Sequence, residues 1–141
     1  MSYIGVDYGT RRVGIAVSDE SGVLAFPAEV VAEREAVARI AALARDREAR
    51  GIVIGESKNF DGRDNPVMAR IRVFAKKVNA ATGIKIFFEP EFMTSAAAMR
   101  EGETAEEKID ASAAALILQS FLDKGGQGTI NTAPSGHASR D

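Results

Sequence analysis

The sequence predicts an α/β protein with a five-stranded mixed sheet flanked by helices on both faces. First, three short segments rich in β-branched residues open the chain, with turn residues between them. Second, helical and strand patterns alternate after these segments. Third, 141 residues with 45% apolar and 27% charged side chains suit one compact folded domain.

The first three strands are expected to follow one another as hairpins. YIGVD at 3–7 and RVGIAVS at 12–18 are separated by the turn-forming YGTR. GVLAFP at 22–27 predicts the third strand, with Pro27 closing it. Strands joined by such short turns run antiparallel, so this part of the sheet is expected to be antiparallel.

Helices and strands alternate in the middle of the chain. Residues 33–50 carry apolar side chains at helical spacing, and Gly51 follows as a stop signal. IVIG at 52–55 is a continuous apolar run, which is typical of a buried central strand. Asn65 and Pro66 provide an N-cap and a first-turn proline for the next helix. The apolar residues of that helix recur at helical intervals: Val67, Ile71, Phe74 and Val78.

Two further helices and one strand are expected in the last third of the chain. Gly83 ends the preceding helix, and IKIFF at 84–88 predicts a strand. A short helix is expected from Thr94 to Gly102, followed by an acidic link. Residues 110–123 are apolar on nearly every side and predict a buried helix.

These elements give the order β-β-β-α-β-α-β-α-α, which is the order of the ribonuclease H-like fold. We expect residues 1–123 to form a single domain. Residues 124–141 show no apolar periodicity and are expected to form a flexible polar tail.

Composition excludes several kinds of site. The absence of cysteine excludes disulfides, thiolate zinc sites, iron–sulfur clusters and a cysteine nucleophile. The single histidine, His137, lies in the predicted tail, so histidine zinc motifs are absent. A metal site must therefore use oxygen ligands, which favours Mg²⁺, Mn²⁺ or Ca²⁺. The net charge of −2 gives no overall basic field, and no apolar run approaches a membrane span, so we expect a cytoplasmic protein.

Three carboxylates are candidates for such a site. Asp7 ends the first strand, Glu91 follows the strand at 84–88, and Asp110 opens the last helix. Each also has an ordinary structural interpretation: an Asx turn for Asp7, a loop carboxylate for Glu91 and an N-cap for Asp110. If the three converge at one edge of the sheet, however, their mutual repulsion requires cations. Two such ions can activate water for phosphodiester hydrolysis.

Basic residues gather in another part of the sequence. Residues 58–77 carry a local charge of +4 from six basic and two acidic side chains. Within this segment we expect Lys58 and Arg63 to bind nucleic acid, because they lie between a strand and a helix N-terminus. Arg11 and Arg12 in the first turn are expected to add to them. Lys76 and Lys77 are expected on a solvated helix face.

Several motifs resemble those of the YqgF/RuvX family, Holliday-junction-resolvase-like proteins with a ribonuclease H-like fold. DYGTRRVGIAVSD at 7–19 resembles the family's opening motif, and DASAAALILQSFLD at 110–123 resembles its ending. GESKNFDG at 55–62 and PEFMTS at 90–95 are more distant matches. The resemblance implies a nuclease that uses Mg²⁺ or Mn²⁺, with Asp7, Glu91 and Asp110 as its metal-binding and catalytic acids.

The resemblance also implies a substrate: nucleic acid, either the 5′ end of pre-16S ribosomal RNA or, in the older inference, branched DNA. Ribosomal particles are then possible partners, no membrane partner is expected, and the chain is expected to be a monomer or weak homodimer. An ATPase of the actin and Hsp70 type shares an aspartate-glycine-threonine hairpin, but 141 residues supply at most one of its two lobes.

Departures from the family pattern favour a second hypothesis, a catalytically weakened module that binds RNA or ribosomes. Phe92 stands where the family has arginine, and Pro90 where it has aspartate. The link at 100–108 holds four acidic and two basic side chains, where the family is rich in lysine and arginine. Glu56 follows the predicted central strand and could join or replace Glu91 in the metal site, although a surface loop position is the simpler interpretation.

Overall fold

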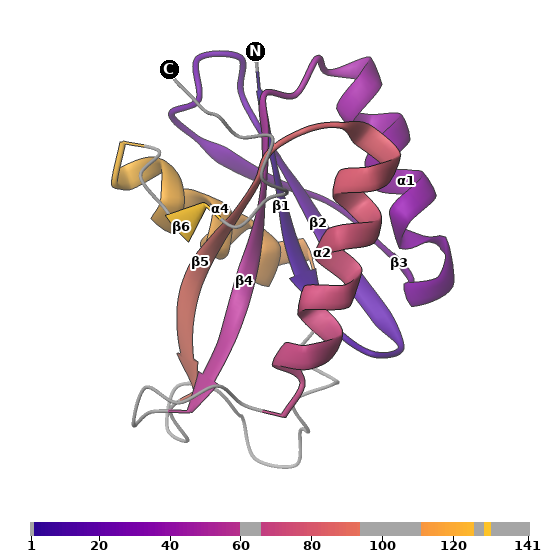
Figure 1. Ribbon diagram of the computed structural model, residues 1–141. Helices are drawn as coiled ribbons and strands as arrows, with labels where there is room; N and C mark the ends of the chain where they lie inside the picture. Colours follow the sequence, from indigo (N-terminus) through magenta and orange to yellow (C-terminus); the bar gives the residue numbers. More distant parts are fainter. Residues whose placement is uncertain (1, 60–65, 94–110, 126–128, 131–141) are drawn as a thin grey trace.

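The computed structural model describes residues 2–59, 66–93, 111–125 and 129–130, which form a layered α/β structure (Figure 1). A six-stranded sheet has the order β3-β2-β1-β4-β5-β6. Its strands are β1 (Tyr3–Tyr8), β2 (Arg12–Ser18), β3 (Ala25–Ala32), β4 (Gly51–Asn59), β5 (Ile86–Met93) and β6 (Thr129–Ile130). β1, β2 and β3 pair antiparallel, β1, β4 and β5 pair parallel, and the short β6 is antiparallel to β5. The predicted mixed sheet of five strands is confirmed, and the two-residue β6 extends it.

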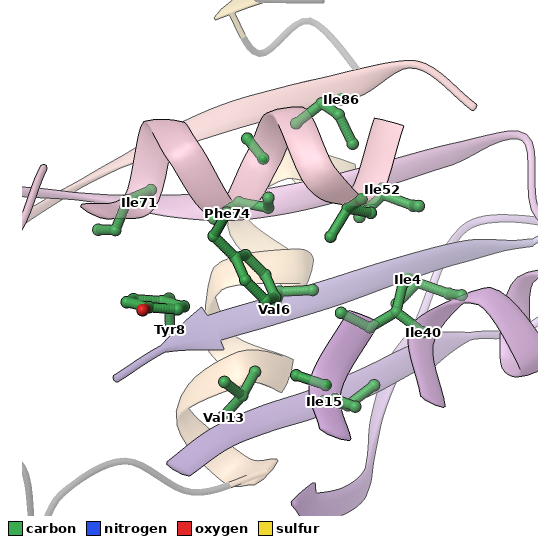
Figure 2. Packing of buried hydrophobic residues seen from close by; sticks show 14 of the residues in the cluster. Ile4, Val6, Tyr8, Val13, Ile15, Ile40, Ile52, Ile71, Phe74 and Ile86 are labelled. Atoms are coloured by element: carbon green, nitrogen blue, oxygen red, sulfur yellow. The ribbon is translucent and has the colours of Figure 1, made fainter. Parts of the chain in front are cut away.

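Helices cover both faces of the sheet, as predicted. α1 (Glu33–Asp46) and α2 (Met68–Thr82) lie on one face, and α4 (Ala111–Asp123) lies on the other (Figure 1). Figure 2 shows part of the larger core, in which Phe74 of α2 and Ile40 of α1 pack over the apolar side chains of β1. The second core lies under α4 and contains Val53, Leu118 and Phe121. No helix in the described part of the chain is long and apolar enough to cross a membrane.

The residues of β1 alternate between these two cores. Ile4, Val6 and Tyr8 belong to the core beneath α1 and α2. Gly5 lies on the α4 face, where a Cβ atom at this position would be 2.7 Å from Leu118 Cβ and 2.9 Å from the Ala114 carbonyl oxygen. Glycine at this position therefore lets α4 approach the backbone of the sheet closely.

The third strand differs from its predicted position. It begins at Ala25 and continues through Pro27 to Ala32. A register shift opposite Ile15 and Ala16 makes room for one extra residue in β3. Because β3 is at the end of the strand order and the ladder is irregular at this point, proline does not end the strand.

Other boundaries also differ from the predictions. α1 ends at Asp46 rather than at residue 50, and Glu48 then adopts a positive φ of 52°. α2 begins at Met68, after a turn at Pro66 and Val67. β6 lies within the predicted polar tail, at residues 129–130. The predicted helix at 94–102 and the Asn65 N-cap lie outside the described residues.

Candidate active site

Asp7 is the central residue of the candidate site, and the sheet geometry fixes the face on which it lies. It is the fifth residue of β1, half-buried, and lies on the same face as Gly5, which packs against α4. Its register partner on β2 is Gly14. On the other side, the pairing of β1 with β4 ends one residue earlier, at Val6 and Ile54. Gly14 has no side chain, so β2 places none directly beside Asp7.

The direction of α4 relates its start to the Asp7 end of β1. The Tyr3 and Phe121 rings have centroids 5.5 Å apart, and one pleat further along β1, Gly5 meets Leu118 and Ala114. From Phe121 back to Ala114, α4 therefore advances toward the carboxyl end of β1, while it crosses the sheet obliquely (Figure 1). The start of the helix thus faces the half of β1 that contains Asp7. Asp110, which precedes α4 in the sequence, lies outside the described residues.

The carboxyl ends of β1, β4 and β5 point to the same edge of the sheet (Figure 1). Glu91 belongs to β5, where its backbone is in register with Ser57 of β4. Strand ends at one edge of a parallel sheet commonly form ligand sites. Among the residues the structure describes, no group of three acidic or histidine side chains is placed to hold a metal ion. The convergence of Asp7, Glu91 and Asp110 is therefore still a prediction.

Glu56 leaves the sheet on the opposite face from Asp7. β4 continues without a register shift from Ile52 to Asn59, so Glu56 lies on the same face as Ile54, beneath α2. The Ser57 backbone amide next to it contacts the Met68 sulfur at 3.3 Å, at the start of α2. This geometry argues against the hypothesis that Glu56 joins Asp7 in one metal site.

The donors at the Asp7 edge suit a hard divalent cation. Asp7 provides carboxylate oxygens, and the chain has no cysteine to favour a softer metal. A carboxylate at this position therefore fits Mg²⁺ or Mn²⁺.

Two of the four predicted nucleic-acid-binding cations can be placed at this edge. Arg11 lies in the turn after β1, and Arg12 is the first residue of β2; both are exposed. The Arg11 carbonyl accepts a hydrogen bond from the Glu33 amide at 3.0 Å, which fixes this turn against the start of α1. Lys58 belongs to β4, but its side chain is not described, and Arg63 lies outside the described residues.

The structure also reveals a pocket that sequence reasoning missed. It has a volume of about 280 Å³ and lies on the α1–α2 face. The Tyr8 hydroxyl donates a hydrogen bond to Glu33 Oε2 at 3.0 Å, and the Tyr8 and Phe74 ring centroids are 4.8 Å apart. Burial raises the pKa of Tyr8, and the bond to Glu33 raises it further. The pocket is lined by Tyr8, Glu33, Ala69, Arg70, Val73, Phe74 and Lys77.

A buried carboxylate was missed as well. Glu89 is only 2% exposed, and it accepts hydrogen bonds from Ser120 Oγ and Lys124 Nζ, both at 2.6 Å. It is one residue beyond the apolar run at 84–88 that predicted the strand. Periodicity alone gave no signal that α4 would cover this position.

Comparison with known proteins gives a consistent family match. A family model described as "RuvX: Holliday junction resolvase" matches residues 1–124. A protein of Nitratidesulfovibrio vulgaris is 35% identical over 133 residues, which cover 87% of this chain and 94% of that protein. A protein of Anaeromyxobacter dehalogenans is 37% identical over 134 residues, covering 88% and 98%. Both relatives carry the name "Putative pre-16S rRNA nuclease".

Solved structures of Thermus thermophilus RuvC share the fold. One has a TM-score of 0.57 at 16% identity and covers 93% of this chain and 100% of its own. Another, in complex with a Holliday junction substrate, has a TM-score of 0.55 at 18% identity and covers 93% and 99%. These similarities confirm the predicted ribonuclease H-like fold.

Proposed function

Because the chain belongs to the RuvX family, we propose that it is a divalent-metal-dependent nuclease that processes the 5′ end of pre-16S ribosomal RNA. The nuclease activity follows from the family and the relatives' names. The dependence on metal, the particular substrate and the cytoplasmic location are the further parts of this proposal.

The observation that carries the proposal is the placement of Asp7. It is half-buried near the carboxyl end of an interior strand, on the face that α4 covers, and its partner on β2 is Gly14. The carboxyl ends of β1, β4 and β5 lie at the same edge of the sheet, where strand ends commonly form ligand sites.

In this proposal Asp7, Glu91 and Asp110 hold the ions. Bound Mg²⁺ or Mn²⁺ would supply an activated water and stabilise the leaving oxygen. Arg11 and Arg12, exposed beside the end of β1, bind phosphates of the substrate and hold it over the edge of the sheet. Lys58 and Arg63 are proposed to extend this contact.

A cleavage assay with two substrates tests the proposal. A pre-16S RNA carrying its 5′ leader and a four-way DNA junction are incubated in parallel with Mg²⁺ or Mn²⁺. We expect cleavage of the RNA, and we expect Asp7→Asn to slow it about 100-fold or more, because a ligand oxygen becomes a neutral amide. Asp46→Asn, which makes the same change at an exposed position at the end of α1, is the control and should cleave normally.

Other outcomes would favour the competing functions. Cleavage of the junction alone would make the chain a resolvase, as the family description states. RNA binding without cleavage, unchanged by Asp7→Asn, would favour the weakened binding module. The acidic replacements at 100–108 in the sequence are the observation that favours this module.

A further inference from the structure

We propose that the pocket between Tyr8, Glu33 and α2 binds one nucleotide of a single-stranded segment of the substrate. This inference rests on the proposed nuclease function and adds a second contact, on the face of the sheet opposite Asp7. The ligand class is a nucleotide within an RNA or DNA strand, recognised through its base and its phosphates.

The charges on the wall that α2 contributes are complementary to those of such a ligand. Arg70, Val73 and Lys77 line the pocket at helical intervals of three and four residues, so they form one stripe along α2. The two cations are separated by about 10 Å along the helix axis, with the exposed Val73 between them. A cation, an apolar surface and a second cation match a phosphate, a base and the next phosphate.

The inner wall offers a base both apolar contact and hydrogen bonds. Phe74 and the ring of Tyr8 form its apolar part. Glu33 accepts a hydrogen bond from the Tyr8 hydroxyl, and a carboxylate has acceptor capacity for further donors such as a base amino group or a ribose 2′-hydroxyl. The volume of about 280 Å³ is near the lower end for ligand pockets, which suits one base rather than a larger ligand.

The position of the pocket connects it to the candidate active site. Asp7 and Tyr8 are adjacent in β1 and lie on opposite faces of the sheet. A strand that crosses the sheet edge at the end of β1 would pass Arg11 and Arg12 between the two sites. Contacts on both faces would hold the strand in one register relative to Asp7.

Two neighbouring lysines provide a matched test. Lys76 and Lys77 are both exposed on α2, but only Lys77 lines the pocket. The full chain is titrated with fluorescein-labelled 15-nucleotide single strands, one of RNA and one of DNA, in EDTA, and binding is followed by fluorescence anisotropy. We expect Lys77→Glu to weaken binding about fivefold and Lys76→Glu less than about twofold, because only the first reverses a direct phosphate contact.

A neutral substitution tests the shape of the pocket separately from its charge. Ala69 is exposed and lines the pocket, so Ala69→Leu should fill it and weaken binding about threefold at unchanged charge. Circular dichroism melts check that each variant is folded, and Lys77→Met against Lys76→Met replaces the glutamate pair if either fails. Equal affinity for the RNA and DNA oligonucleotides would assign the contact to the base and the phosphates. Tighter binding of the RNA would add a contact with the 2′-hydroxyl. Either result supports the proposal.

Three results would overturn the proposal: equal losses for the two lysine variants, no effect of Ala69→Leu, or no binding of single strands by the unaltered chain. The assay contains no metal and measures no cleavage. An inactive chain with the expected binding pattern would therefore refute the nuclease and leave the nucleotide pocket intact. Metal-dependent cleavage without binding of single strands would support the nuclease and refute the nucleotide pocket.

Discussion

Glu89 of β5 and Lys124, the residue after α4, form an ion pair with 2.6 Å between Lys124 Nζ and Glu89 Oε2. The carboxylate side chain is 2% exposed, whereas the lysine side chain is half exposed. The pair joins β5, the strand that contains Glu91, to the helix that packs on the Asp7 face of the sheet. It therefore helps fix the relative position of two elements of the candidate site.

Removing the lysine should destabilise the fold. Lys124→Ala leaves the buried Glu89 carboxylate with Ser120 as its remaining described donor, which should lower the free energy of unfolding by about 1–3 kcal/mol. Urea denaturation at pH 7 measures this loss, and Lys76→Ala on the exposed face of α2 is the control. Adding Glu89→Gln to Lys124→Ala should restore part of the stability by removing the buried charge. A double variant less stable than Lys124→Ala would contradict this account.

Gly5→Ala should also destabilise the protein. The new methyl group would be 2.7 Å from Leu118 Cβ and 2.9 Å from a backbone oxygen of α4, so the helix must move away from the sheet. We expect a loss of about 1–3 kcal/mol in chemical denaturation. Leu118→Gly removes the Leu118 Cβ atom and leaves only the contact with the Ala114 carbonyl oxygen, so the double variant should be more stable than the sum of the two single effects predicts. Strict additivity would show that the two residues do not interact as described.

Tyr8→Phe should change how stability depends on alkaline pH. Burial and the bond to Glu33 raise the pKa of Tyr8 above its ordinary value of 10.0. A raised folded-state pKa means that this stabilisation is complete below about pH 10 and is lost as the pH rises through the folded-state pKa. Urea midpoints between pH 8 and 11 should therefore fall more steeply for the unaltered chain than for Tyr8→Phe. Parallel curves would show that Tyr8 does not contribute.

Glu56→Gln should leave metal binding intact, because Glu56 and Asp7 lie on opposite faces of the sheet. Calorimetric titration with Mn²⁺ should give an affinity within about twofold of the unaltered chain, whereas Asp7→Asn should lose about tenfold or more. If the two variants lost the same affinity, Glu56 would have to reach around the sheet edge to the metal.

The sequence predicted what depends on local pattern. Short β-branched segments separated by turn residues identified β1 and β2, and the end of the first strand located Asp7 near the carboxyl end of β1. The face of Glu56 could not be predicted in this way, because the apolar run ends at Gly55 while the strand continues to Asn59 through backbone pairing with β5. Pairing partners are distant in the sequence, so composition carries no signal of them.

The pocket and the buried glutamate were missed for a related reason. Glu33 is an ordinary acidic residue at a helix start, and only its bond to Tyr8 makes it part of a pocket wall. Lys77 has the pattern of a solvated helix position, which its exposure confirms. Its neighbours across the pocket, Tyr8 and Glu33, come from other elements and are distant from it in the sequence. Such relationships arise from tertiary packing.

The irregular third strand bears on how the folded chain meets other copies of itself. β3 ends the strand order of the described sheet and exposes Phe26 and Val30, a composition that invites edge-to-edge aggregation. Pro27 has no amide hydrogen to offer an incoming strand, and the extra residue beside it breaks the regular spacing that such a strand would need. The bulge therefore disfavours amyloid-like extension of the sheet at the position where the exposed apolar side chains would otherwise favour it.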